Sequence, residues 1–334
     1  MTAPNAPSSS AKPLSAAAQR SLLIDVVKGL AIILVAMGHT NQGLSREILI
    51  PWTVRVNAFI YAFHMPAFFF VSGIFVLSSL QKRGLRHFLV NRAKTLLWPF
   101  YVFAILISPW TPYLFRRWMH EGPPPLHDVL RNLVSANAEW FLPTLFFSLI
   151  IVALLRRVPA PLLFLLSWPL GVYWHQIGLA WVDRTVEFLP FLWLGVWVGS
   201  RYGVIERVPR GVAASLAMVL GGVIYVLTPN QLYLSNWRFV PVGIAGTLML
   251  LLLARVIGSG ALGRGLAWLG VASLGIYLMA SYGQGFGRLL LHLVHVRAPL
   301  PHLLFDSAVA IAFGAWVYQH REKLRIGWIF ICPF

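Results

Sequence analysis

Apolar runs of about twenty residues recur along this chain, and they restrict it to folds that can span a lipid bilayer. Hydrophobic residues make up 58% of its 334 residues and charged residues 11%, whereas a soluble domain carries about a quarter charged residues. Many of the 14 tryptophans lie at the ends of the apolar runs, where a bilayer protein places them. The sequence therefore predicts an all-α, polytopic transmembrane helical bundle.

The runs predict about ten spans, with both termini in the cytoplasm. With this alternation most of the 27 Lys and Arg residues fall in cytoplasmic connections, in agreement with the positive-inside tendency. The predicted domains are a disordered cytoplasmic tail (1–19), a transmembrane domain (20–320) and a short cytoplasmic tail (321–334). The spans are expected at about 20–40, 54–80, 95–112, 140–155, 160–178, 186–200, 211–228, 239–257, 266–282 and 303–319.

The net charge of +17 has a simple explanation in a membrane protein. The cations lie in short connections between apolar runs, so membrane topology and anionic lipid account for them without a nucleic-acid partner. A single cysteine, Cys332, excludes an internal disulfide and a zinc–cysteine cluster, and we expect no metal site. The glycines have neither phosphate-loop nor dinucleotide-binding spacing.

Beyond Arg20 at its start, the first span, RSLLIDVVKGLAIILVAMGHT, contains three ionisable residues. At about 100° per residue, Lys28 and His39 fall on one stripe of the helix, roughly 16 Å apart along its axis. Asp25 precedes Lys28 by three residues and can form an ion pair with it. Charges facing lipid are costly, so the stripe is expected to face the protein interior or a hydrated cavity. Alternatively, Asp25 and Lys28 lie at the membrane edge and His39 caps the far end.

His39 is the main candidate for proton chemistry, because an imidazole takes and returns protons near neutral pH. Its partner is either Asp25 or Glu139. Glu139 opens the fourth span and is expected at the membrane face toward which His39 points.

The second span contains the stretch FHMPAFFFVSG. Pro66 is expected to interrupt the helix and to free backbone groups there. His64 is then either a catalytic residue or the partner of a freed carbonyl. Ser72, with Gly73, is either a nucleophile or, more commonly in membrane helices, part of a close-packing device.

A basic loop is predicted between the second and third spans. Within it, Arg83, Arg92 and Lys94 are either a topology signal or a binding surface for a phosphorylated ligand, because Arg pairs well with phosphate oxygens.

Taken together, these motifs resemble the acyltransferase-3 family of integral membrane acyltransferases. The most specific parts are the first span, with Lys28 where the family usually has Arg, ten residues, and then His39, and the second-span stretch given above. The segment NRAKTLLWPFY is similar to the family's basic segment before the third span. Other similar positions are Asp25, the four residues from Glu139 to Leu142, and Ser273 with Tyr277, whereas Ala280 replaces a late family His.

The resemblance implies transfer of an acyl group, commonly acetyl from acetyl-CoA, to a sugar hydroxyl of a surface glycan or glycolipid. Acyl-CoA would be a donor substrate, no cofactor would stay bound, and a bacterial inner membrane would be the location. His39 would be the general base oriented by Glu139, and Lys28 or a backbone donor would stabilise the oxyanion. The donor would contact Arg92, Lys94, Arg83, Ser72 and Tyr277.

Two alternatives remain open at this point. A covalent acyl-His or acyl-Ser relay would replace direct transfer. The stripe of Asp25, Lys28 and His39 also fits a proton relay in a proton-coupled transporter or flippase, in which the basic loops would be only topological.

Overall fold

The computed structural model describes residues 16–47, 51–110, 126–136, 139–228 and 236–334. These residues form helices and contain no strand, so the predicted all-α class is confirmed. The first half comprises α1 (Ala16–Glu47), α2 (Pro51–Tyr61), α3 (His64–Arg83), α4 (Leu85–Arg92), η1 (Ala93–Leu97), α5 (Trp98–Tyr101), η2 (Val102–Ile107), η3 (Ser108–Trp110), α8 (Leu126–Ser135) and α9 (Phe141–Leu154). The second half comprises α10 (Ala160–Tyr173), α11 (Ala180–Val198), η4 (Gly199–Arg207), α12 (Arg210–Leu227), α13 (Phe239–Ile257), α14 (Ala261–Val271), α15 (Ser273–Leu293), α16 (Pro299–His320) and α17 (Gly327–Phe330).

Within the described part of the chain, six helices are long and apolar enough to cross a membrane. The number rises to eight if two sharply bent helix pairs each count as one span, and α9 and α10 are shorter apolar helices. The membrane character of the chain is therefore confirmed. The count of ten spans and the cytoplasmic termini remain predictions.

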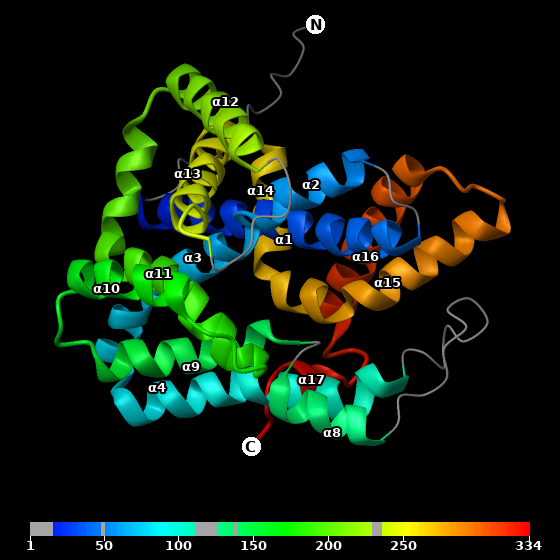
Figure 1. Cartoon of the computed structure of the whole chain (residues 1–334), viewed down its shortest axis with the longest axis horizontal. Coiled ribbons are helices and arrows are strands. Elements are labelled where there is room, and N and C mark those ends of the chain that lie inside the picture. The colour runs from blue at the N-terminus through cyan, green and yellow to red at the C-terminus, as the bar shows by residue number, and fades with distance from the viewer. Residues whose placement is uncertain (1–15, 48–50, 111–125, 137–138, 229–235) are drawn as a thin grey trace, which may run out of the picture.

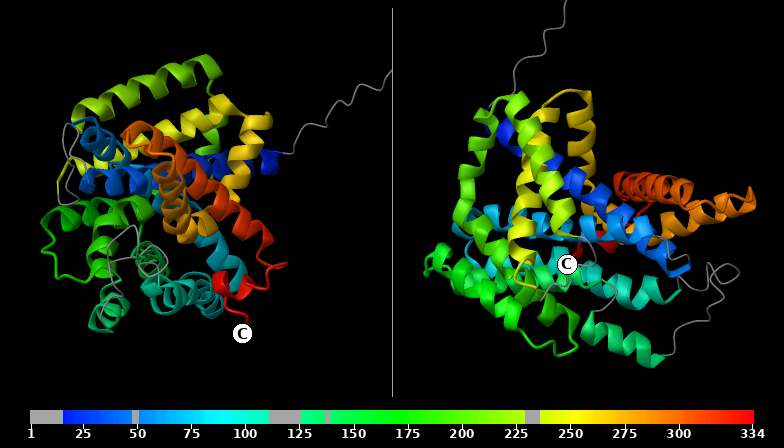
Figure 2. Two further views of the ribbon diagram at one scale, coloured as in Figure 1. Left: turned by 90° about the vertical axis from the view of Figure 1, so that its right-hand side faces the viewer. Right: turned by 45° about the horizontal axis from the view of Figure 1, so that its top comes forward.

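Helix α1 runs through the middle of the molecule (Figure 1). Helices α12 and α13 lie on one side of it and α8 to α11 on the other, while α14 crosses it, and two further views show the same arrangement (Figure 2). Helices α14, α15 and α16 all pack against α1. Apolar residues along α1, such as Val27, Ile32 and Val35, are buried in the two main core clusters.

Two glycines allow α1 and α14 to cross at the level of Asp25. A Cβ atom added to Gly29 would collide with the carbonyl oxygen of Leu266, and one added to Gly270 would collide with the carbonyl oxygen of Asp25. Small residues at such a crossing let helix backbones approach closely in a membrane.

We expect Gly29→Ala to destabilise the protein by about 1–3 kcal/mol, because the added methyl group forces two backbones apart. Thermal unfolding in detergent measures this loss. Gly222→Ala is the matched control, since its Cβ would enter open space in α12. An unchanged Tm for Gly29→Ala would contradict the close crossing.

Several sequence-based boundaries differ from the structure. The basic segment after the second span is mostly helical rather than a loop, because Gly84, with φ of 73°, turns the chain and α4 starts at Leu85. The predicted single span 266–282 is two helices, α14 and α15, bent by 81°. The predicted span 186–200 starts earlier, at Ala180.

Candidate active site

His39 lies on α1 beside α2. The ring centroids of His39 and Tyr61 are 6.5 Å apart in an edge-to-face arrangement. Tyr61 also lies against Gly38, whose Cβ would stand 3.0 Å from the tyrosine ring, and its hydroxyl donates to the Gln42 side chain at 3.3 Å. This side of α1, at Gly38 and Gln42, is therefore covered by Tyr61.

Another side of α1 is covered by α15 and α16. Gln284 donates through Nε2 to the carbonyl oxygen of Ala36 at 3.0 Å, and Ser307 donates to the hydroxyl oxygen of Thr40 at 3.1 Å. Further along, a terminal nitrogen of Arg288 lies 2.9 Å from the point where a Cβ of Gly43 would stand.

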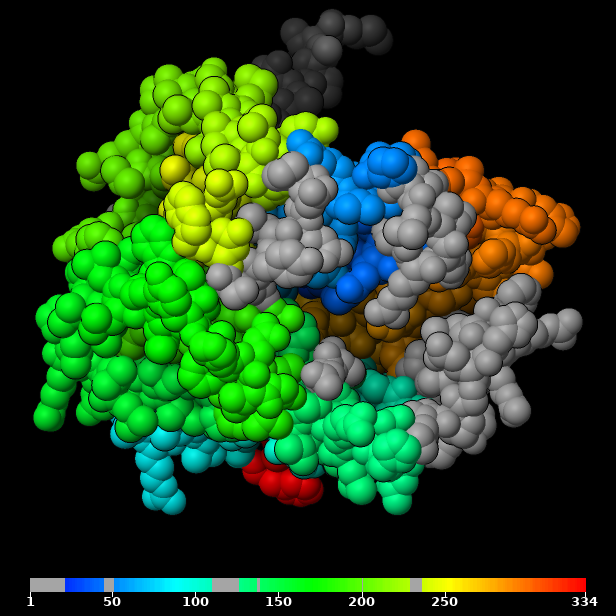
Figure 3. All heavy atoms as spheres, in the orientation of Figure 1, coloured from blue at the N-terminus to red at the C-terminus, as the bar shows by residue number. Residues whose placement is uncertain are grey.

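The position of His39 on the helix explains its exposure. At about 100° per residue, His39 is rotated by about 40° from Gly43 and by about 60° from Gln42. It therefore faces between Tyr61 on α2 and Arg288 on α15, and its side chain is exposed although its neighbours Gly38 and Thr40 are buried. Part of α1 is visible at the centre of one face of the molecule, in dark blue (Figure 3).

His64 lies behind Tyr61, at the break between α2 and α3. The predicted interruption of the second span is confirmed, since α2 ends at Tyr61 and α3 begins at His64. The buried His64 ring places Nδ1 2.7 Å from the carbonyl oxygen of Ile60. Because a carbonyl only accepts, we assign the proton to Nδ1, which leaves the Nε2 lone pair as an acceptor.

Asp25 and Lys28 form the predicted ion pair, with Nζ and Oδ1 3.2 Å apart. Both side chains are about one quarter exposed. Between Lys28 and His39 the stripe carries Ile32 and Val35, which are both buried in the apolar core. The ion pair and the imidazole therefore lie at two separate levels of α1.

Glu139 has partners of its own. Ser108 donates to one carboxylate oxygen, and Asn132 donates to the other at 3.3 Å. Burial raises the pKa of the Glu139 carboxyl, and these hydrogen bonds oppose that rise. No contact between Glu139 and His39 is found among the residues that the structure describes, so the predicted pairing stays a hypothesis.

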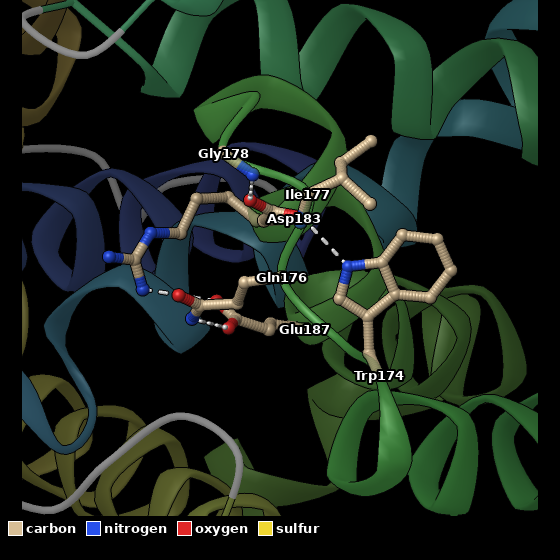
Figure 4. A network of polar contacts seen from close by, with 7 residues as sticks. Trp174, Gln176, Ile177, Gly178, Asp183 and Glu187 are labelled. Atoms are coloured by element: carbon tan, nitrogen blue, oxygen red, sulfur yellow. Dashed lines mark hydrogen bonds and ion pairs between the residues drawn. The ribbon is translucent and has the colours of Figure 1, made fainter.

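A polar network near Glu139 escaped the sequence analysis (Figure 4). Asp183 accepts hydrogen bonds from Trp174 Nε1 at 2.8 Å and from the backbone N–H groups of Ile177 and Gly178 at 3.0 and 3.1 Å. These bonds tie the preceding loop to the first turns of α11.

Glu187, one turn after Asp183, is also buried. It accepts from Gln176 at 3.3 Å and pairs with Arg184 at 3.0 Å, and the Arg184 guanidinium lies 5.6 Å from the centre of the Trp140 ring. The signal that could have found this network is the group of three charged residues, Asp183, Arg184 and Glu187, inside an apolar run.

Ser72 and Tyr277 lie where helices pack together. The Ser72 hydroxyl donates to the carbonyl oxygen of Phe68 at 2.8 Å, and a Cβ on Gly73 would collide with the carbonyl oxygen of Leu192 in α11. This geometry favours the close-packing interpretation of Ser72. The Tyr277 ring packs against Phe141, with centroids 5.6 Å apart.

Two groups of basic residues are candidates for binding a phosphorylated ligand: Arg83, Arg92 and Lys94 along the segment from α3 to η1, and the arginines that line one cavity. Arg92 stacks over Phe88 at 5.2 Å and is close enough to Arg83 for their charges to repel, while Lys94 accepts the backbone N–H of Cys332 through its carbonyl at 3.1 Å. A nearby cavity of about 390 Å³ is lined by Leu77 of α3 and, among others, by Arg156, Arg157, Trp197 and Arg201. Among the residues described, no group of three or more His, Cys, Asp or Glu could hold a metal ion.

Comparison with known proteins gives one matching family model, described as an acyltransferase domain, over residues 22–303. A protein of Escherichia coli named inner membrane protein YcfT is 23% identical over 208 residues, which cover 54% of this chain and 57% of that protein. A nodulation protein NolL of Sinorhizobium fredii is 30% identical over 175 residues, covering 52% of this chain and 45% of that protein. The NolL protein of Mesorhizobium japonicum is 27% identical over 202 residues, with 56% and 51% covered.

The chain thus spans about half the length of the curated relatives it matches. No solved structure gives a significant match.

Proposed function

This chain belongs to the acyltransferase family whose domain covers residues 22–303, and from that membership we propose that it is an integral membrane O-acyltransferase. It moves an acyl group, acetyl in the simplest case, from acyl-CoA to a hydroxyl of a carbohydrate or glycolipid acceptor. Its location is a bacterial inner membrane, which agrees with the apolar helices and with the name of the Escherichia coli relative.

The observation that carries this proposal is the exposed His39 between Tyr61 and Arg288. A general base must reach the proton of a hydroxyl that arrives from outside the protein. His39 is accessible to such an acceptor, whereas His64 is buried. His64 remains the second candidate, because its Nε2 carries a free lone pair next to Tyr61.

In the proposed reaction, His39 takes the proton of the acceptor hydroxyl while its oxygen attacks the thioester carbonyl. The tetrahedral oxyanion collapses, the C–S bond breaks, and the CoA thiolate leaves with the proton returned by His39. Lys28 is roughly 16 Å from His39 along the helix axis, so a backbone N–H at the α2–α3 break is the nearer of the two oxyanion donors considered. Lys28 is paired with Asp25 and lies at a different level of the stripe from His39.

The donor phosphates are assigned to Arg83, the last residue of α3, and Arg92, the last residue of α4. Both belong to the basic segment, and a phosphate bound there would gain charge-assisted hydrogen bonds from their guanidinium groups. Lys94 lies two residues further along the same basic segment. Ser72 and Tyr277 are weaker candidates for donor contacts. The Ser72 hydroxyl already bonds the carbonyl oxygen of Phe68, and the Tyr277 ring packs against Phe141.

We expect Arg92→Gln to raise the KM for acetyl-CoA about tenfold or more, with little change in the KM for the acceptor, because one charge-assisted contact to phosphate is lost. Steady-state kinetics at varied donor concentration measure this change. Arg264→Gln, at an exposed arginine that bonds a backbone carbonyl, is the control. Equal donor KM values in both variants would remove Arg92 from the donor site.

The reaction itself is tested with purified protein in detergent and acetyl-CoA, with and without a crude extract of surface-glycan precursors. The proposal predicts release of free CoA that rises when the extract is added. A proton-coupled transporter or flippase would release no CoA under either condition, and that result would favour it over the acyltransferase.

A further inference from the structure

A polar cluster of α15 and α16 lies beside His39 and has no role in the reaction described above. Asp306 is completely buried, and its Oδ2 lies 3.1 Å from Nδ1 of His302 and 3.8 Å from Nε of Arg288. His302 is also buried, and its Nε2 lies 3.0 Å from the carbonyl oxygen of Val296.

The hydrogen bonds determine how many protons this cluster holds. Both nitrogens of His302 face oxygen atoms, and the carbonyl of Val296 can only accept. A proton is therefore needed on both sides of the ring: either His302 is an imidazolium beside an Asp306 carboxylate, or a neutral His302 accepts from a protonated Asp306. In both cases Arg288, His302 and Asp306 together carry one net positive charge.

That charge lies next to the site. The Arg288 guanidinium reaches α1 at Gly43, where the lack of a side chain makes room for it. Gly43 follows His39 by one helical turn on the same side of α1, a rise of about 6 Å. The Arg288 side chain is 27% exposed, so the arginine, like His39, can be reached from outside the protein.

We propose that Arg288 recognises the acceptor, by binding an anionic oxygen of the sugar whose neighbouring hydroxyl lies at His39. The acceptor class is accordingly an acidic carbohydrate, with a carboxylate or phosphate group near the acylated position. Arg pairs with such groups through two parallel N–H donors. Asp306 holds the guanidinium from behind, and His302 keeps Asp306 in place. This inference rests on the acyltransferase function proposed above.

The test compares an oligoglucuronate and a cello-oligosaccharide of equal length as acceptors, with labelled acetyl-CoA as donor. Wild type is expected to acetylate the oligoglucuronate with the lower KM. Arg288→Gln should raise that KM about ten- to hundredfold and leave the KM for acetyl-CoA unchanged, and Arg288→Lys should restore part of the loss. A structural role for Arg288 would not change one KM selectively or depend on the acceptor's charge.

Gly43→Ala provides an independent variant that keeps the charge. Its methyl group would displace the guanidinium and should raise the KM for the oligoglucuronate as well, whereas Gly222→Ala should not. Equal acceptor KM values for wild type, Arg288→Gln and Gly43→Ala would overturn the role of Arg288 while leaving the acyltransferase intact. No transfer to either oligosaccharide by a wild type that acetylates the crude surface-glycan precursors would overturn the acidic acceptor class alone, and no transfer to any of the three would overturn both proposals.

Discussion

Replacing His39 with Ala is expected to lower acyl transfer by about 10²- to 10⁴-fold, the range that a positioned general base contributes. His39 is exposed, so its removal leaves no cavity in the packed core. The protein should therefore insert, purify and unfold like wild type while its turnover is lost. CoA release under saturating donor, measured together with thermal unfolding, checks both halves of this expectation.

His39→Gln is the matched variant, because an amide keeps hydrogen bonding near this position but cannot act as a base at neutral pH. It should be as inactive as His39→Ala. Activity close to wild type in either variant would move the role of base to another residue, and His64→Gln would then be the next variant to measure.

The largest expected effect on stability is at the Arg184–Glu187 pair. Arg184→Ala leaves the buried carboxylate of Glu187 with its amide partner Gln176 but without its cation. Breaking such a pair from one side costs about 3 kcal/mol or more. Thermal or denaturant unfolding in detergent should show this loss clearly.

Glu187→Gln is the control, since it removes the buried charge and retains groups that hydrogen-bond. The double variant Arg184→Ala/Glu187→Gln should be more stable than Arg184→Ala alone, because no unpaired charge remains. A double variant that is less stable than Arg184→Ala would show that the carboxylate does not depend on the arginine.

The hydropathy pattern and the position of proline predicted individual helices and one break between helices. Helix α13 occupies the expected residues 239–257, and the break near Pro66 follows from the chemistry of proline. The bend between α14 and α15 was missed, since an apolar run carries no information about a change of direction. Just before that bend, Gly270 packs against the backbone of Asp25, a residue that is far from it in the sequence.

The geometry of the candidate site could be predicted only within a single helix. Helical periodicity placed Asp25, Lys28 and His39 correctly relative to one another, because they share one helix. The surroundings of Glu139 come from η3 and α8, whose packing no local pattern reveals. Arg288 lies beyond the predicted end of its span at residue 282, and its approach to Gly43 depends on how α15 packs on α1.

The most direct test of the proposed function follows the acyl group itself. Wild type and His39→Ala would be incubated side by side with acetyl-CoA labelled in the acetyl group and with surface-glycan precursors. The proposed function predicts label on the carbohydrate as an alkali-labile oxygen ester with wild type, and almost none with His39→Ala. Label that remains on CoA or appears only as free acetate, or equal transfer by the two proteins, would contradict it.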